Sequence, residues 1–454
     1  MHKRSSLKLG VSFFLFGLVN NVLYVIILSA ALDLVPPSTP KGIIAFCNIT
    51  PALLVKLGWP YFLKGRIRYA RRIIGCCTLS FIGMLVIALH ESLFSRLLGI
   101  CFASFSSGLG EMSFLQLSTT YSRSAGGQSV GSASSYGLSY SILMLLDRYF
   151  ASGTGAAGIV GAFMWWELRG LGVRTGVGIS AVLPFILPLA YFFLLPRPAA
   201  FMHQSSSASY TLVPADDLAT EITDDLSAED GLESHVEPKI TVALSATDKW
   251  RLVKPMLLKY MLPLFCVYTF EYTINQGIAP TLLYPVPSHG LLSKIIHSVR
   301  DYYPLWQLVY QTTVFFSRSS ISLGLKTLPA HLLPAPAIIQ FVILLILVLE
   351  SSVGLLPEDR AAGSIFLVFV LISIEGICGG LAYVNVFHRI NQEQPDPSSV
   401  HDPELTKQER EFKIASVGFA DSSGILLASI LAVPTELELC RAQVARAKYL
   451  CRGL

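Results

Sequence analysis

The sequence predicts an all-α integral membrane protein in which two bundles of helices flank a long acidic loop. Only 14% of its 454 residues are charged, and 52% are apolar. A soluble protein of this length would carry about 114 Asp, Glu, Lys and Arg residues, whereas this chain has 34 basic and 30 acidic ones. So few charges cannot cover a soluble globule, which excludes an ordinary soluble enzyme, a nucleic-acid-binding protein and a disordered scaffold.

Apolar stretches long enough to cross a bilayer recur along the chain. A helix needs roughly 20 residues to span a hydrocarbon core of about 30 Å. We expect about eleven spans, near residues 9–32, 42–63, 73–90, 97–119, 151–168, 176–195, 256–280, 303–324, 336–356, 362–387 and 412–433. The first span is too long for the apolar part of a cleaved signal, so we expect it to remain as an anchor.

The segment between residues 196 and 255 differs from these stretches. Residues 205–238 carry nine acidic and no basic side chains, a composition that cannot bury enough surface to fold. We therefore expect an N-terminal bundle of about six helices at 1–195, a disordered loop at 196–255, a C-terminal bundle of about five helices at 256–435 and a basic tail at 436–454. Two bundles joined by a long loop are typical of a two-half transporter.

Positive charge predicts the orientation in the membrane. The turn 64–72 holds five basic residues, whereas the turn 33–41 is nearly neutral. Because basic turns stay in the cytosol, we expect the N-terminus and the 196–255 loop to be cytosolic. Eleven crossings would place the C-terminus on the other side, yet the tail is basic. Either the chain has a twelfth span, or the tail lies along the membrane surface.

Ionisable and amide side chains interrupt several of the apolar spans. A charge at mid-bilayer costs roughly 2.5–3.5 kcal/mol on insertion scales, so it needs a partner or an aqueous cavity. The candidates for a solute or proton pathway are Glu271, Arg318, Glu111, Glu375, Asn20, Asn21, Asn275 and Asp421. Lys56 lies near enough to the end of its span for its ammonium group to reach the interface.

These candidates have a functional and a structural interpretation. A carboxyl group sheltered from water can exchange a proton within the physiological pH range. Arg318 stays charged, so it suits an anionic group or a carboxylate counter-charge. In the structural alternative, a pair between Arg318 and a carboxylate such as Glu271 only locks two helices together. For Asn20 and Asn21 we expect interhelical hydrogen bonds.

Other features indicate structure rather than chemistry. The eight cysteines lie mostly in apolar runs without metal or redox spacing, and we interpret them as small buried apolar residues. The glycine run 153–161 fits a close helix-packing face and lacks the context of a phosphate loop. We expect no metal, no cofactor and no nucleic-acid partner. Because the sequence holds no catalytic arrangement, we also expect no enzymatic activity.

Several segments carry a family resemblance, in order and along nearly the whole chain. They are Gly17–Tyr24, Leu28–Ala31, Ser106–Leu115, Ser152–Gly158, Glu271–Gly277, Tyr303–Gln311, Ser317–Ser320, Glu375–Asn385 and Glu409–Phe412. As a set they resemble the battenin family of lysosomal and vacuolar membrane proteins, in its fungal branch. The basic turn after the second span is similar to that of major-facilitator transporters, although their usual Asp is missing here.

The resemblance implies a major-facilitator-like fold in a vacuole or lysosome membrane. It implies a transporter with roles in vacuolar pH homeostasis and basic amino-acid (arginine) transport and, from animal relatives, clearance of glycerophosphodiesters. The implied partners are the lipid bilayer, a small solute and protons. Glu271, Arg318 and Glu111 lie on family motif positions.

Two function hypotheses remain open from the sequence. In the first, the two bundles rock around a midplane site, and protonation of Glu271 or Glu111 is coupled to solute movement with Arg318 as counter-charge or anion contact. In the second, the protein transports nothing. It regulates vacuolar acidification or membrane trafficking through protein partners that bind the acidic stretch 205–238.

One segment departs from the family pattern. Residues Ser132–Arg148 separate two stretches that are nearly adjacent in the family. Our hypothesis is a retained or misassigned intron, which uninterrupted coding reads through the segment in mature message would contradict. A genuine insertion would distort the start of the fifth span.

Overall fold

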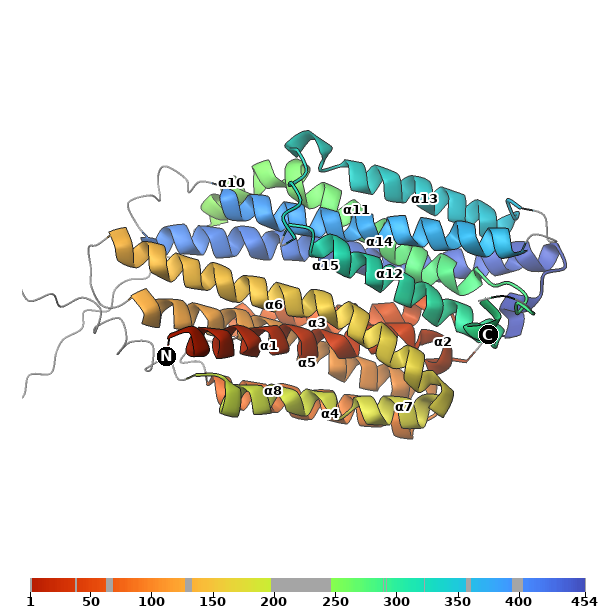
Figure 1. Cartoon of the computed structure of the whole chain (residues 1–454), viewed down its shortest axis with the longest axis horizontal. Helices are drawn as coiled ribbons and strands as arrows, with labels where there is room; N and C mark the ends of the chain where they lie inside the picture. Colours follow the sequence, from red (N-terminus) through yellow and green to blue (C-terminus); the bar gives the residue numbers. More distant parts are fainter. Residues whose placement is uncertain are drawn as a thin grey trace, which may run out of the picture.

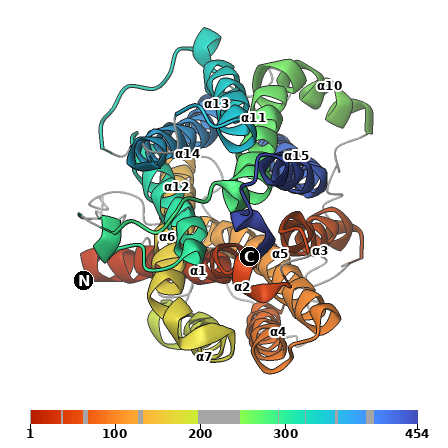
Figure 2. The ribbon, with the colours of Figure 1, turned by 90° about the vertical axis from the view of Figure 1, so that its right-hand side faces the viewer.

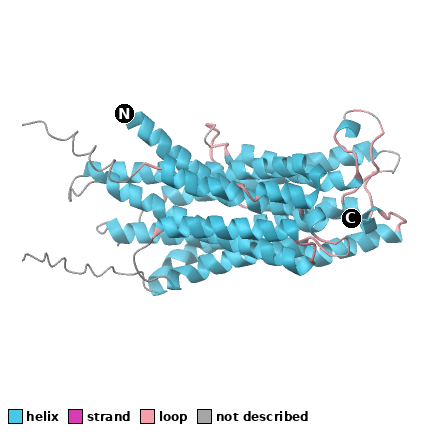
Figure 3. Ribbon diagram, turned by 90° about the horizontal axis from the view of Figure 1, so that it is seen from below, coloured by secondary structure: helices cyan, strands magenta, loops and turns pink. Residues whose placement is uncertain are grey.

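The fold is almost entirely helical. The computed structural model describes residues 2–36, 39–62, 68–126, 133–196, 246–288, 290, 292–321, 323–356, 361–393 and 403–453. Within these ranges the chain holds no strand. The helices run along one common direction, and most of the connecting loops lie toward the two ends of the molecule (Figure 3).

The helices follow one another in the order of the expected spans. The N-terminal half contains α1 (His2–Ser29), α2 (Ala31–Leu34), α3 (Gly42–Phe62), α4 (Tyr69–Leu89), α5 (Leu93–Gly126), α6 (Ala133–Leu168), η1 (Arg169–Leu171), α7 (Gly172–Ser180), η2 (Leu183–Phe185), α8 (Ile186–Leu189) and η3 (Ala190–Leu194). The C-terminal half contains α10 (Ala246–Met256), η4 (Leu257–Met261), α11 (Leu262–Thr273), η5 (Ile274–Ile278), η6 (Ala279–Thr281), η7 (Leu292–Lys294), η8 (Val299–Asp301), α12 (Tyr302–Arg318), η9 (Ala330–Leu332), α13 (Ala335–Ser352), α14 (Ala361–Gln392), α15 (Pro403–Ala445) and η11 (Leu450–Gly453).

Every expected span overlaps a helical segment of the described chain. By length and apolar composition, eight segments are able to cross a membrane, and one of them, Tyr149–Leu194, contains α6 together with α7, α8 and η3. The shorter apolar helix Gly42–Leu57 and the 17-residue α12 cover the two remaining spans. The chain is therefore a multi-pass membrane protein with about eleven crossings.

The helices form two bundles that lie against each other (Figure 2). In the N-terminal half α1 packs on α6, and α5 packs on α3 and α4. In the C-terminal half α12 packs on α14, and α11 packs on α15. The halves meet along two seams, where α6 contacts α12 and α3 contacts α15. Of the candidate residues, Glu111, Arg318 and Asp421 lie near these seams.

The predicted packing face of the glycine run is confirmed. A Cβ atom on Gly153 would stand 2.0 Å from the carbonyl oxygen of Phe14, and one on Gly158 would stand 2.2 Å from Oε1 of Gln311. The first contact joins α6 to α1, and the second joins α6 to α12 across the seam between the halves. Only glycine allows the backbones to approach this closely.

The outer surface is apolar, as a surface in contact with lipid requires. Phe193, Leu258 and Phe366 are 82%, 77% and 68% exposed. In water such exposure would be costly, but lipid tails are as apolar as these side chains. In contrast to this apolar surface, polar residues such as Glu271, Glu375 and Asn275 lie inside the helical assembly.

The two ends of the chain lie at opposite ends of the molecule (Figure 1). We call the end that holds the start of α1 the amino end, and the end that holds the last turn of α15 the carboxyl end. An odd number of crossings places the two ends of the chain on opposite sides. The described residues therefore do not require a twelfth span. The tail is held in place, since Nη1 of Arg446 donates to the carbonyl oxygen of Ser352 at 2.9 Å.

A disulfide joins Cys440 to Cys451 at the carboxyl end. The prediction that all eight cysteines are small buried apolar residues is therefore wrong for this pair. The bond forms because the chain folds back after α15, which spacing alone does not reveal. Cys76, Cys77 and Cys378 are free and buried, as expected.

Two expected boundaries can be compared with the structure. Helix α10 begins at Ala246, so the last part of the predicted 196–255 loop is helical. Helix α15 continues to Ala445 and takes in the first part of the predicted tail. The acidic stretch 205–238 lies outside the described residues.

The segment that departs from the family pattern belongs to a helix. Helix α6 runs without a break from Ala133 to Leu168. The expected distortion at the start of the fifth span is therefore wrong: the residues extend the helix toward the amino end. Their origin in a retained intron stays a prediction.

Candidate solute and proton site between the two halves

Arg318 is the last residue of α12 and points into the assembly. Its Nη2 donates to the hydroxyl of Tyr268 at 3.0 Å, and its guanidinium carbon lies 4.3 Å from the ring centroid of Tyr383. A cation over a tyrosine face is stabilised by the ring quadrupole. Gly155 of α6 faces it from the other half, because a Cβ there would lie 3.9 Å from Cδ of Arg318.

The structural alternative for Arg318 required an ion pair with a carboxylate. Among the described residues, no carboxylate lies within ion-pair distance of Arg318. Its Nε is buried and has no hydrogen-bond partner. Glu271 is close enough for the two charges to act on each other, but not to touch. The guanidinium therefore keeps capacity to bind an anionic group.

Glu271 lies in the interior of the C-terminal half, where it is only 1% exposed. Its Oε1 accepts a hydrogen bond from the hydroxyl of Tyr310, and its Oε2 accepts one from Nε2 of Gln340 at 3.1 Å. Gly379 makes room for the carboxylate, since a Cβ there would stand 2.0 Å from Oε2. The group thus has neutral hydrogen-bond donors but no touching cation.

Glu375 and Asn275 form a second buried polar cluster beside Glu271. Glu375 is fully buried, and its Oε1 accepts from Nδ2 of Asn275 at 2.9 Å. The same Nδ2 donates to the backbone carbonyl of Glu271 at 3.0 Å, and Oδ1 of Asn275 accepts from Nε2 of Gln307 at 3.1 Å. Oε2 of Glu375 has no partner. A buried carboxyl group without a cation is a natural place for a proton to bind.

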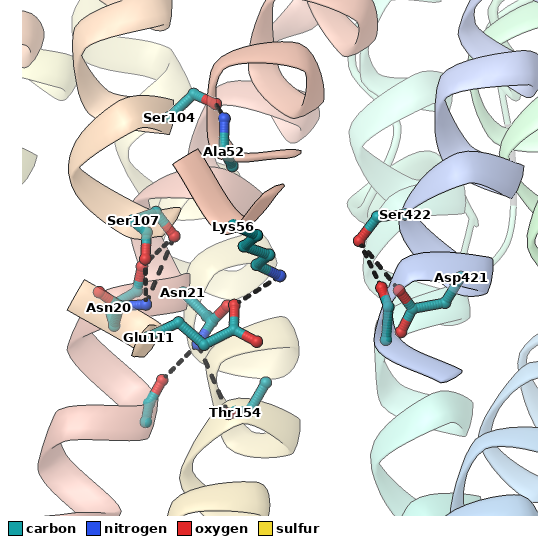
Figure 4. Close-up of polar contacts among 12 residues, drawn as sticks. Asn20, Asn21, Ala52, Lys56, Ser104, Ser107, Glu111, Thr154, Asp421 and Ser422 are labelled. Atoms are coloured by element: carbon teal, nitrogen blue, oxygen red, sulfur yellow. Dashed lines mark hydrogen bonds and ion pairs between the residues drawn. The ribbon is translucent and has the colours of Figure 1, made fainter. Parts of the chain in front are cut away.

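Lys56 of α3 and Glu111 of α5 form an ion pair in the N-terminal half, with 2.8 Å between Nζ and Oε2 (Figure 4). The prediction that Lys56 extends to the membrane interface is therefore wrong, because a carboxylate inside the protein satisfies its charge. The two side chains keep 28% and 31% of their area open. Partial exposure of a charged pair between helices indicates an aqueous space rather than lipid.

Asp421 of α15 faces this pair from the C-terminal half. Figure 4 shows its carboxylate directed toward Lys56 and Glu111, and the charges of both residues act on it. The hydroxyl of the adjacent Ser422 donates a hydrogen bond to Oδ1 of Asp421 at 3.0 Å. Among the described residues no cation lies within ion-pair distance of it.

Asn20 and Asn21 join helices of the N-terminal half. Nδ2 of Asn20 donates to the carbonyl oxygen of Ser107 at 3.0 Å, and the Ser107 hydroxyl donates back to the carbonyl of Asn20 at 3.0 Å. Nδ2 of Asn21 donates to the carbonyl of Gly17 at 2.9 Å and reaches Oγ1 of Thr154 at 3.5 Å. The bonds to Ser107 and to Thr154 are the interhelical hydrogen bonds expected of these residues, whereas the bond to Gly17 lies within α1 (Figure 4).

The structure thus divides the predicted residues into three groups. Glu271, Glu375 and Asn275 form a buried cluster within the C-terminal half. Glu111, Arg318 and Asp421 lie near the seams between the halves, whereas Asn20 and Asn21 tie α1 to its neighbours. Sequence reasoning did not find the partners Tyr268, Tyr383, Tyr310, Gln340 and Gln307. Within the described residues no group of three His, Cys, Asp or Glu side chains could hold a metal ion.

Comparison with known proteins identifies the family. A family model described as CLN3 protein matches residues 11–442. The chain belongs to the CLN3, or battenin, family. Protein BTN1 of Mycosarcoma maydis is 46% identical over 490 residues, which cover 99% of this chain and 89% of the relative. Protein btn1 of Schizosaccharomyces pombe is 38% identical, covering 98% of this chain and 97% of the relative.

These CLN3-family relatives are fungal, which confirms the expected branch. The crystal structure of an autoinhibited POT family peptide transporter aligns with a TM-score of 0.52, covering 97% of this chain and 96% of that one. At 11% identity the likeness shows the fold alone. It confirms a fold of the major-facilitator type for this CLN3-family chain.

Proposed function

We propose that this CLN3-family protein is a proton-coupled secondary transporter of a vacuolar, lysosome-like membrane. Its solute in this proposal is a basic amino acid such as arginine, and its transport contributes to vacuolar pH homeostasis. The observation that carries the proposal is the placement of Arg318 and Asp421. Both are charged, both lie next to the other half, and neither has an ion-pair partner among the described residues.

Charges in such positions favour a transporter over a static membrane protein. A charge inside a membrane protein is costly unless it is paired or hydrated. A charge that only locks two helices together would form an ion pair, as Lys56 and Glu111 do at 2.8 Å. A charge left unpaired between two halves is instead suited to a ligand that enters when the halves separate.

Glu271 and Arg318 supply a route for coupling protons to an anionic group. Ionised Glu271 attracts the guanidinium of Arg318, because the two charges act on each other. A proton on Glu271 removes that attraction and leaves Arg318 free for an anionic group of the solute. By thermodynamic linkage, the solute group then also favours proton binding at Glu271.

A glycerophosphodiester is the second candidate solute. The planar guanidinium of Arg318 fits a phosphodiester as well as a carboxylate. A non-transporting regulator remains the alternative from the sequence, and it depends on the acidic stretch 205–238. Deleting that stretch separates the two: loss of vacuolar acidity control with intact solute flux favours the regulator.

The membrane orientation follows the charge pattern of the sequence. In this proposal the amino end of the bundle faces the cytosol, together with the basic turn 64–72 and the 196–255 loop. The carboxyl end faces the vacuole lumen. A disulfide between Cys440 and Cys451 at that end supports this orientation, since disulfides persist in oxidising compartments and are rare in the cytosol.

Uptake by reconstituted protein tests the proposal. Purified protein in liposomes with an imposed pH gradient is expected to accumulate labelled arginine. Arg318→Ala should abolish uptake, and Glu271→Gln should leave uptake that no longer responds to the gradient. Glu438→Gln is a matched control, because Glu438 is exposed and pairs only with Arg441 nearby.

Two results would count against the proposal. Absence of uptake of arginine and of glycerophosphodiesters alike contradicts a transporter of either solute. Uptake that is unchanged in both Arg318→Ala and Glu271→Gln contradicts the assigned site.

A further inference from the structure

Asp421 is a charged side chain that has no ion-pair partner among the described residues. It lies on α15, inside the assembly, and its hydrogen bonds come from its own neighbour, Ser422, whose hydroxyl donates to Oδ1 at 3.0 Å. Lys56 is the cation that acts on it most strongly. However, the ammonium of Lys56 already contacts Glu111 at 2.8 Å.

The local charge balance is therefore negative. Lys56 and Glu111 neutralise each other, which leaves the single negative charge of Asp421 beside them. The pair is accessible from outside the packed interior, since 28% of the Lys56 side chain and 31% of the Glu111 side chain are exposed. A cationic group that enters this space gains the attraction of Asp421 without displacing an existing partner.

A positive charge lies on the other side of the same space. Arg318 is held by Tyr268 at 3.0 Å and by the ring of Tyr383 at 4.3 Å. The two tyrosines lie within electrostatic range of both Arg318 and Asp421. One unpaired cation and one unpaired anion thus flank the same pair of aromatic side chains.

We propose that Asp421 determines solute specificity by binding a cationic group, while Arg318 binds an anionic group of the same molecule. The solute then carries an anionic group and, apart from it, a cationic group that Asp421 binds, and an analogue that lacks this cationic group is taken up less. Glu111 does not share this role, because its carboxylate already forms an ion pair with Lys56. The inference rests on the proposed transport function and adds the residue that selects the solute.

Matched solute pairs test this role. Citrulline has the shape of arginine without its cationic side-chain group, and glycerophosphoglycerol lacks the cation of glycerophosphocholine. Uptake of each pair is measured in the same liposomes for the wild type, Asp421→Asn, Asp421→Glu and the control Glu438→Gln. The ratio within a pair does not depend on how much protein folds, so a loss of stability alone leaves it unchanged.

The expected result is a preference, in at least one pair, for the member that carries the additional cationic group. This preference should fall about tenfold or more in Asp421→Asn, in line with the strength of a hydrogen bond to a charged group. It should persist in Asp421→Glu and in Glu438→Gln. Asp421→Asn should leave uptake of the member without that cationic group nearly as it was.

Two results overturn the inference while the transporter proposal stands. In the first, the wild type takes up citrulline as well as arginine, and glycerophosphoglycerol as well as glycerophosphocholine. In the second, Asp421→Asn keeps the wild-type preference. Absence of uptake of all four solutes overturns the transport function itself and this inference with it.

Discussion

Charged residues join the two halves at the carboxyl end, whereas in the middle no ion pair between described residues crosses from one half to the other. At the carboxyl end Nζ of Lys41 lies 3.1 Å from Oε1 of Glu436, and the backbone N–H of Lys41 donates to Oε2 at 2.6 Å. Arg169 pairs with Asp301 at 3.1 Å. In the middle, Asp421 has no such partner among the described residues.

The difference separates charges that close the molecule from charges that can bind a ligand. The Lys41 and Glu436 side chains are only 3% and 11% exposed. Each charge is therefore neutralised by the other, and neither is open to a ligand. The ion pairs between the halves that the structure describes all lie at the carboxyl end, and the third joins Arg300 to Asp33. We expect the paired residues to contribute stability and the unpaired ones to contribute binding.

The largest loss of stability is expected for Lys41→Met. This change leaves the Glu436 carboxylate buried without its cation, and breaking a buried pair in this way costs about 3–5 kcal/mol. Thermal unfolding in lipid nanodiscs measures the effect. Lys259→Met, which removes an exposed lysine paired with Glu393, is the matched control. Equal stability of the two variants would contradict a closing role for Lys41.

A smaller, pH-dependent loss is expected for Asp301→Asn. Burial alone would raise the pKa of Asp301, but the backbone N–H groups of His297 and Ser298 and the guanidinium of Arg169 hold that pKa below its ordinary value overall. With a lowered pKa, the ionised pair stabilises the fold above the unfolded pKa of about 3.9. This stability is lost as the pH falls through the lower folded pKa.

The difference in unfolding temperature between the wild type and Asp301→Asn should therefore be equal at about pH 7 and about pH 5. It should shrink only below about pH 4. A difference that disappears near pH 5 would show that the Arg169 pair does not hold this carboxylate ionised. Acidification to about pH 5 alone would then release this contact.

A weak effect is expected for Asp33→Asn. Its pair with Arg300 is long, at 3.8 Å, and half of the Arg300 side chain is exposed. Exposed pairs contribute about 0–1 kcal/mol. Thermal unfolding at low and at high salt measures this contribution. A loss of stability as large as that of Lys41→Met would show that the exposure of an ion pair does not determine how much it stabilises this protein.

The smallest change in stability is expected for Asp421→Asn. The amide oxygen can still accept from Ser422, and no ion pair is lost, so the change should stay below about 0.5 kcal/mol. The same unfolding assay measures it. A loss of several kcal/mol would indicate that Asp421 is part of the packed structure and not open to a solute.

The helical fold could be predicted from the sequence because long apolar runs and a close-packing glycine run are local features. The candidate site could be predicted only as separate residues. Lys41 and Glu436 are 395 positions apart, and no local pattern pairs them. Its position near the end of a span predicts that Lys56 extends to the interface, whereas its partner Glu111 lies on another helix, where no local pattern reveals it.

The absence of an ion partner for Arg318 also depends on three-dimensional placement. In sequence, Arg318 and Glu271 are natural candidates for a pair. In the structure, Tyr310 and Gln340 donate hydrogen bonds to the carboxylate of Glu271. The guanidinium of Arg318 donates to the hydroxyl of Tyr268 and lies over the ring of Tyr383. Each charged group contacts neutral partners on neighbouring helices, which composition and spacing cannot reveal.

Direct binding of labelled arginine to the purified protein tests the central distinction between unpaired and paired charges. The account predicts that Arg318→Ala and Asp421→Asn each weaken binding about tenfold or more, whereas Glu436→Gln binds like the wild type at a temperature where all of the variants are folded. Equal affinity in all four proteins, or a loss confined to Glu436→Gln, would contradict it.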